Sequence, residues 1–104
     1  MSANELDELK AEIKAFAAAR DWEKFHTPKN LAMAIAGEAG ELAAEFQWLT
    51  ADESELASLT SEQLEAISLE IADVQIYLLR IADVLNIDLP ASVRKKMKIN
   101  EARF

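Results

Sequence analysis

The chain contains no cysteine, and only two of its 104 residues are glycine, two are proline and one is histidine. Without thiols there is no disulfide framework, no thiolate metal site and no cysteine nucleophile, and a cytoplasmic location is predicted. The shortage of turn-forming residues argues against an all-β fold, and a hydrophobic content of 51% argues against disorder. The composition therefore predicts one helical domain over residues 1–104.

Long apolar runs and an excess of positive charge are also missing. The longest run of apolar or small residues, 31–37, is far shorter than the roughly 20 residues that cross a bilayer. The N-terminus is acidic where a secretory signal would be basic and then apolar. With 19 acidic against 11 basic residues and a formal net charge of -8, neutralisation of a nucleic-acid backbone is disfavoured. We expect neither a membrane nor a nucleic-acid partner.

Four helical segments are predicted from the spacing of apolar residues and from capping signals. Ser2 with Glu5 is a capping-box signal for the first, and Thr27-Pro28 marks the start of the second. Thr60 with Gln63 is a capping-box signal for the third. The polar, acidic stretch 50–59 reads as a connecting loop. The predicted spans are about 4–20, 28–49, 60–86 and a basic segment from 89 onward.

Acidic residues border the apolar stripes of the second and third segments. Glu38 and Glu41 lie three residues apart on one predicted helix, and Glu70 and Asp73 lie three apart on the other. If the two helices pack through their stripes, the four carboxyl groups converge and lose part of their hydration, which costs several kcal/mol for an unpaired charge. Oxygen-only ligation suits Mg²⁺ or Mn²⁺. The pattern predicts a divalent metal site.

Other readings of these acids remain open. Either motif alone is typical of a solvated helix face, although the pair in register is less often accidental. Gly37 and Gly40 flank Glu38 inside a helix at a cost of about 1 kcal/mol each, which predicts a close approach by another helix or by a ligand. A di-iron centre needs an E-x-x-H motif on each of two helices, and the single histidine, His26, lies in a predicted loop. Water is the remaining nucleophile, since no serine lies near His26.

Four groups of residues together resemble the MazG-like all-α nucleoside triphosphate pyrophosphohydrolases, most closely the dCTP pyrophosphatase branch. They are DWEKFHTPKNL at 21–31, GEAGEL at 37–42 with FQW at 46–48, EIADV at 70–74 with YL at 77–78, and KMKIN at 96–100. The resemblance implies an all-α four-helix bundle with two long central helices, assembled as a homotetramer, a dimer of dimers. It also implies hydrolysis of a nucleoside triphosphate between the α and β phosphates.

The resemblance implies a role for each matching side chain. It assigns Mg²⁺ to Glu38, Glu41, Glu70 and Asp73, with Glu38 or Glu41 as the group that accepts a proton from water. Lys96 and Asn100 would contact phosphate and sugar, and a lysine suits a phosphate as a point charge. The remaining expected substrate-binding residues are Trp22, His26, Asn30, Trp48 and Tyr77.

The same residues also have simpler explanations that involve no substrate. The aromatic rings offer flat surfaces to a base, and the helical phase places Trp48 on the arc of Glu41, but for each ring taken alone core packing is the better explanation. The basic residues from Arg94 to Arg103 also suit the C-terminus of a helix without any ligand. A non-catalytic acidic interaction module, or a related enzyme acting on dUTP or phosphoribosyl-ATP, fits the same composition.

Overall fold

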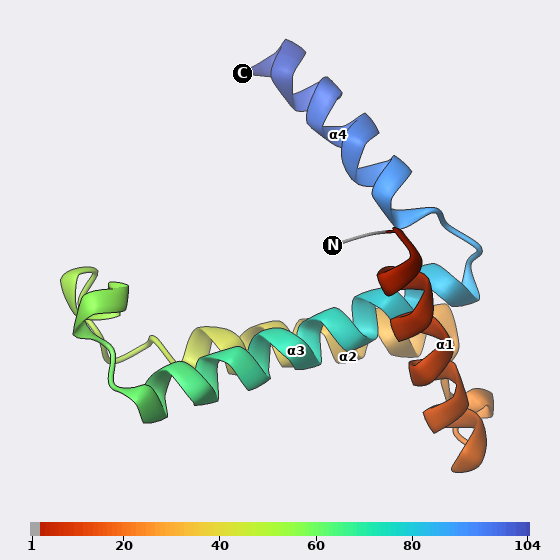
Figure 1. Cartoon of the computed structure of the whole chain (residues 1–104), viewed down its shortest axis with the longest axis horizontal. Helices are drawn as coiled ribbons and strands as arrows, with labels where there is room; N and C mark the ends of the chain where they lie inside the picture. Colours follow the sequence, from red (N-terminus) through yellow and green to blue (C-terminus); the bar gives the residue numbers. More distant parts are fainter. Residues whose placement is uncertain (1–2) are drawn as a thin grey trace. The chain divides into compact units, whose positions relative to one another are not determined.

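Four α-helices and no strand make up residues 3–104, the part that the computed structural model describes (Figure 1). The predicted all-α class is confirmed, whereas the capping box at Ser2 lies outside the described residues. Within the described range, no helix has the length and apolar content to span a bilayer. The helices are α1 (Ala3–Ala19), α2 (Pro28–Ala44), α3 (Ser61–Val84) and α4 (Leu89–Arg103), with 3-10 turns η1 (Glu23–Phe25), η2 (Asp52–Ser54) and η3 (Leu56–Ser58).

The chain forms two compact units. One contains the described residues up to Pro28 together with Leu79–Phe104, and the other is Lys29–Leu78. In the second unit, α2 and the first part of α3 lie side by side (Figure 1). Its buried apolar residues are Leu31 and Ile67, and those of the first unit are Ala17, Leu79 and Ala82. The assignment of residues 1–104 to a single domain stays a prediction.

Helices α3 and α4 begin at side-chain caps. The Thr60 N–H donates to Gln63 Oε1 at 2.9 Å, and the Gln63 N–H donates to Thr60 Oγ1 at 3.1 Å. This reciprocal pair satisfies two amide groups that the first turn of α3 leaves without helical partners, and it confirms the predicted capping box. At α4, the Ala91 N–H donates to Asp88 Oδ1 at 3.0 Å, with Pro90 in the first turn.

Two helices end at non-glycine residues in the left-handed region. Asp21 follows α1 with φ 57°, and Asn86 follows α3 with φ 55°. The next amide then donates five residues back, from Trp22 to the Ala17 carbonyl at 2.9 Å and likewise from Ile87 at 2.8 Å. Aspartate and asparagine tolerate this conformation better than other non-glycine residues. Both glycines of the chain lie in α2, so Asp21 and Asn86 occupy the left-handed positions after α1 and α3 that glycine usually occupies.

The helix predicted to reach Leu49 ends at Ala44, so that prediction is wrong by five residues. Beyond this point amides bond to carbonyls three residues back, as from Leu49 to Phe46 at 3.0 Å. Thr50 and Glu53 then exchange hydrogen bonds of 2.8 and 3.2 Å and start η2. Apolar residues three apart fit a 3-10 turn as well as an α-helix, which explains the error.

Candidate metal centre

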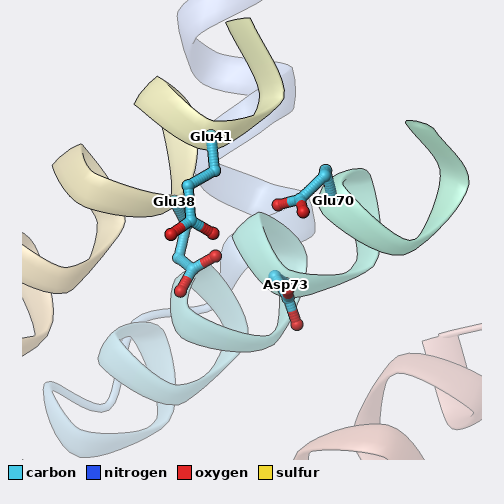
Figure 2. A group of neighbouring side chains, drawn as sticks. All are labelled: Glu38, Glu41, Glu70 and Asp73. Carbon is cyan, nitrogen blue, oxygen red and sulfur yellow. The ribbon is translucent and has the colours of Figure 1, made fainter. Parts of the chain in front are cut away.

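Four carboxyl groups on the facing sides of α2 and α3 form a cluster. Figure 2 shows Glu38 and Glu41 extending from α2 toward Glu70 and Asp73 on α3. One oxygen from each of the four lies within 4.8 Å of the others. Two oxygens on opposite sides of a Mg²⁺ ion are about 4.2 Å apart. The structure brings the four predicted ligands together at close to the spacing that one ion requires.

The environment of these acids favours a bound cation. Glu38 Oε2 and Glu70 Oε2 are buried and have no hydrogen-bond partner. Desolvation raises the pKa of both glutamates, and repulsion from Glu41 and Asp73 raises it further. A divalent ion would satisfy the two buried oxygens and remove the repulsion. The all-oxygen donor set fits a hard ion such as Mg²⁺, Mn²⁺ or Ca²⁺.

Within residues 3–104, no lysine or arginine side chain neutralises the four clustered acids. Arg80, the only arginine or lysine in the third predicted segment, hydrogen-bonds to His26 and forms an ion pair with Asp83. Among the described side chains, no lysine or arginine is paired with the four clustered acids. Their negative charge is therefore left for a ligand to neutralise.

Glu45 is a fifth acid near the cluster that the ligand prediction left out. Its negative charge contributes to the raised pKa of Glu70. Glu45 follows Glu41 by four residues, a spacing that places two side chains on one helical face, and this was the available sequence signal. Its amide bonds to the carbonyl of Leu42 in the first turn after α2.

The space beside Gly37 and Gly40 is open, so the tight helix crossing, one of the two expected explanations for these glycines, does not occur within residues 3–104. A Cβ atom built on either glycine would meet nothing within 4 Å, and neither residue has a positive φ. Both glycines are exposed on α2 next to Glu38. Approach by a ligand or by a second molecule stays a prediction.

A comparison with solved structures supplies the family. A pyrophosphatase from Archaeoglobus fulgidus matches with a TM-score of 0.88 and 38% identity, covering 100% of this chain and 95% of that one. The chain belongs to the MazG-like all-α nucleoside triphosphate pyrophosphohydrolases. The dCTP pyrophosphatase 1 proteins of Homo sapiens and Mus musculus are 42% and 40% identical over 99 residues. This chain spans 58% of their length. No family model matches the chain.

In this family member, the expected substrate-binding residues are divided between the two units. Trp22, His26, Lys96 and Asn100 belong to the first unit, and Asn30, Trp48 and Tyr77 belong to the second. Their roles stay predictions.

The two tryptophans differ in exposure. Trp48 is 87% exposed, which excludes core packing within the chain, and it follows the end of α2. Residues 45–48 do not continue the helix, so Trp48 does not lie on the helical arc of Glu41. Trp22 is 43% exposed and packs edge-on against Phe16, with ring centroids 5.7 Å apart. Both rings keep free surface for a planar ligand.

Proposed function

We propose that the protein hydrolyses deoxynucleoside triphosphates, dCTP foremost, to the monophosphate and pyrophosphate and so clears the nucleotide pool. The convergence of four carboxyl groups, two of them with buried oxygens that lack partners, carries this proposal. The similarity to proteins named dCTP pyrophosphatase 1 supports the choice of substrate. The open surface beside Glu38 supports access to the cluster.

In this proposal Glu38, Glu41, Glu70 and Asp73 hold Mg²⁺, for which Mn²⁺ can substitute. When bound there, the ion would supply positive charge to neutralise the charge that develops on the phosphate oxygens. One of the two glutamates on α2, Glu38 or Glu41, orients the attacking water and accepts its proton. A glutamate that ligates the ion tightly is a poor proton acceptor, so the two share the tasks of ligation and proton transfer.

The residues outside the cluster bind the rest of the nucleotide. We assign the phosphates to Lys96, because a lysine on exposed α4 offers three N–H donors and a full positive charge. Asn100, one turn further along α4, supplies a donor and an acceptor to the sugar. The base is assigned to the side chains Trp22, His26, Asn30, Trp48 and Tyr77.

Replacement of the glycines on α2 by alanine should separate stability from activity. Alanine at Gly37 or Gly40 should stabilise the metal-free protein by about 1 kcal/mol, because alanine is the better helix former and its methyl group meets nothing. The same methyl group should lower the rate of pyrophosphate release if a ligand or a second subunit approaches there. Ala36→Gly, at an exposed site on the same helix, is the control. It should lower the stability of the folded protein by about 1 kcal/mol and leave the rate of pyrophosphate release unchanged. Full activity in both alanine variants would contradict the proposed approach.

We propose a homotetramer that covers part of the apolar surface of α2 and α3. Leu31 on α2 and Ile67 on α3 are buried inside the chain, and other large apolar side chains remain uncovered. Sedimentation velocity at micromolar concentration should show a tetramer, and Leu69→Lys should shift the protein to smaller species. A monomeric parent protein would exclude this assembly. The exposed side chains in question are Met33, Leu64, Leu69, Ile71, Ile76 and Leu78.

A panel of the eight common nucleoside triphosphates, assayed for pyrophosphate release with Mg²⁺ and with Mn²⁺, tests the proposed function. We expect dCTP to have the highest kcat/KM. Phosphoribosyl-ATP should be assayed in parallel. A higher kcat/KM for dUTP or phosphoribosyl-ATP would show that the protein is an enzyme of the same family with a different substrate. If pyrophosphate is released from none of these substrates, the alternative of a non-catalytic interaction module is favoured.

A further inference from the structure

A buried arginine holds the only histidine of the chain. The Arg80 side chain is 7% exposed, and its Nε donates a hydrogen bond to His26 Nδ1 at 3.1 Å. Its Nη1 lies 3.4 Å from Asp83 Oδ2, one turn further along α3. His26 directly follows η1, so the bond ties the link between α1 and α2 to α3. All three residues belong to the first unit.

The direction of this hydrogen bond fixes the protonation of His26. A guanidinium group can only donate, so Nδ1 must present its lone pair, and a neutral imidazole then carries its proton on Nε2. Burial lowers the pKa of His26 below its ordinary value of 6.5, and the positive charge of Arg80 lowers it further. Glu23, on η1, acts in the opposite direction. The neutral imidazole is thus favoured at neutral pH.

We infer that Arg80, anchored by Asp83, is a positioning residue that keeps His26 neutral with its proton on Nε2 and so sets the hydrogen-bonding pattern offered to the nucleotide. This rests on the proposed function, in which His26 contacts the substrate. A neutral His26 in this tautomer offers one N–H donor at Nε2, and the matching atom on the nucleotide is an acceptor such as a carbonyl oxygen or an unprotonated ring nitrogen.

Nitrogen NMR of the imidazole tests the positioning step without substrate. Because His26 is the only histidine, its two nitrogen signals are unambiguous. In the parent protein at neutral pH we expect the proton on Nε2 alone. Arg80→Gln should give a mixture of tautomers and a higher His26 pKa, whereas Asp83→Asn should keep the parent tautomer because the bond from Arg80 Nε remains. A proton on Nδ1 in the parent, or an unchanged tautomer in Arg80→Gln, would overturn the inference. If Arg80→Gln does not fold, the parent spectrum decides.

Two substitutions of His26 separate positioning from recognition. His26→Asn retains an acceptor near the position of Nδ1 for Arg80 but lacks the Nε2 donor, so the KM for dCTP should rise about three- to tenfold, the effect of one hydrogen bond, with the melting temperature little changed. His26→Gln retains a donor near the position of Nε2 but lacks the acceptor for Arg80, so its stability should fall more. Equal KM values in the parent and His26→Asn would contradict the recognition step.

The pH dependence of stability gives a third readout. Because the folded-state pKa of His26 is lowered from 6.5, the unfolded chain takes up a proton first as the pH falls below that value. The stability linked to neutral His26 is complete above about pH 6.5 and is lost as the pH falls toward the folded-state pKa. His26→Asn should remove this component, so the parent should lose stability relative to the variant on acidification. A difference that is constant between pH 7.5 and pH 5 would contradict the inference.

The proposed function and the positioning role of Arg80 can fail separately. If no nucleoside triphosphate is hydrolysed by the parent protein, the proposed function fails, while the tautomer measured by NMR still decides whether Arg80 positions His26. If dCTP is hydrolysed but the tautomer is wrong, only the role of Arg80 is lost.

Discussion

Mg²⁺ should raise the melting temperature of the parent protein, and Asp73→Asn and Glu38→Gln should each abolish most of that rise. Binding of an ion to the folded chain alone stabilises it by mass action, by about 2.7 kcal/mol at a concentration 100 times Kd. Each substitution removes one charged ligand from a group whose oxygens lie within 4.8 Å of one another. Pyrophosphate release should fall about 100-fold or more in the same variants.

The metal-free forms sharpen this prediction. Desolvation, and then repulsion from Glu41 and Asp73, raise the pKa of Glu38, so Glu38→Gln should make the protein more stable without metal while removing most of its response to Mg²⁺. Glu62→Gln, an exposed acid in the first turn of α3, is the control and should keep the full response. Unaltered Mg²⁺ shifts in both cluster variants would show that the ion binds elsewhere.

Lys96→Ala and Trp48→Ala should impair catalysis in different ways. If Lys96 makes the proposed charge-assisted contact to phosphate, Lys96→Ala should lower kcat/KM about 10- to 100-fold for every triphosphate. If Trp48 contacts the base as proposed, Trp48→Ala should change the order of preference among bases. Trp48 is 87% exposed, and its replacement should leave the melting temperature nearly unchanged.

Lys95→Ala is the matched control on α4, because Lys95 is an exposed neighbour of Lys96 with no assigned contact. It should leave both the rate and the order of substrates as in the parent protein. An equal loss of kcat/KM in Lys95→Ala would show that Lys96 acts only through the general positive charge of α4. A uniform loss for all bases in Trp48→Ala would contradict its assignment to the base.

Local signals in the sequence predicted much of the fold and the convergence of the acids. The reciprocal bonds of Thr60 and Gln63 depend on residues three apart, which a sequence shows directly. The acids of α2 and α3 converge because helical spacing places each pair beside an apolar stripe. Such features need no knowledge of distant contacts.

The errors arose where local patterns are ambiguous or contacts are remote. Apolar spacing of three residues at Phe46 and Leu49 fits two kinds of turn, so the end of α2 was misplaced. Glycine in a helix signals space but not what fills it, and the space beside Gly37 is open. The bond between Arg80 and His26 joins residues 54 apart in sequence, beyond any local signal.

Analysis of the products of dCTP hydrolysis tests the central claim most directly. The parent protein should be incubated with dCTP and Mg²⁺, with a chelator-treated sample in parallel, and its products followed by phosphorus NMR. We predict dCMP and pyrophosphate in equal amounts with Mg²⁺ and no turnover after chelation. Formation of dCDP and inorganic phosphate, equal turnover with and without the chelator, or intact dCTP in every sample would contradict the account.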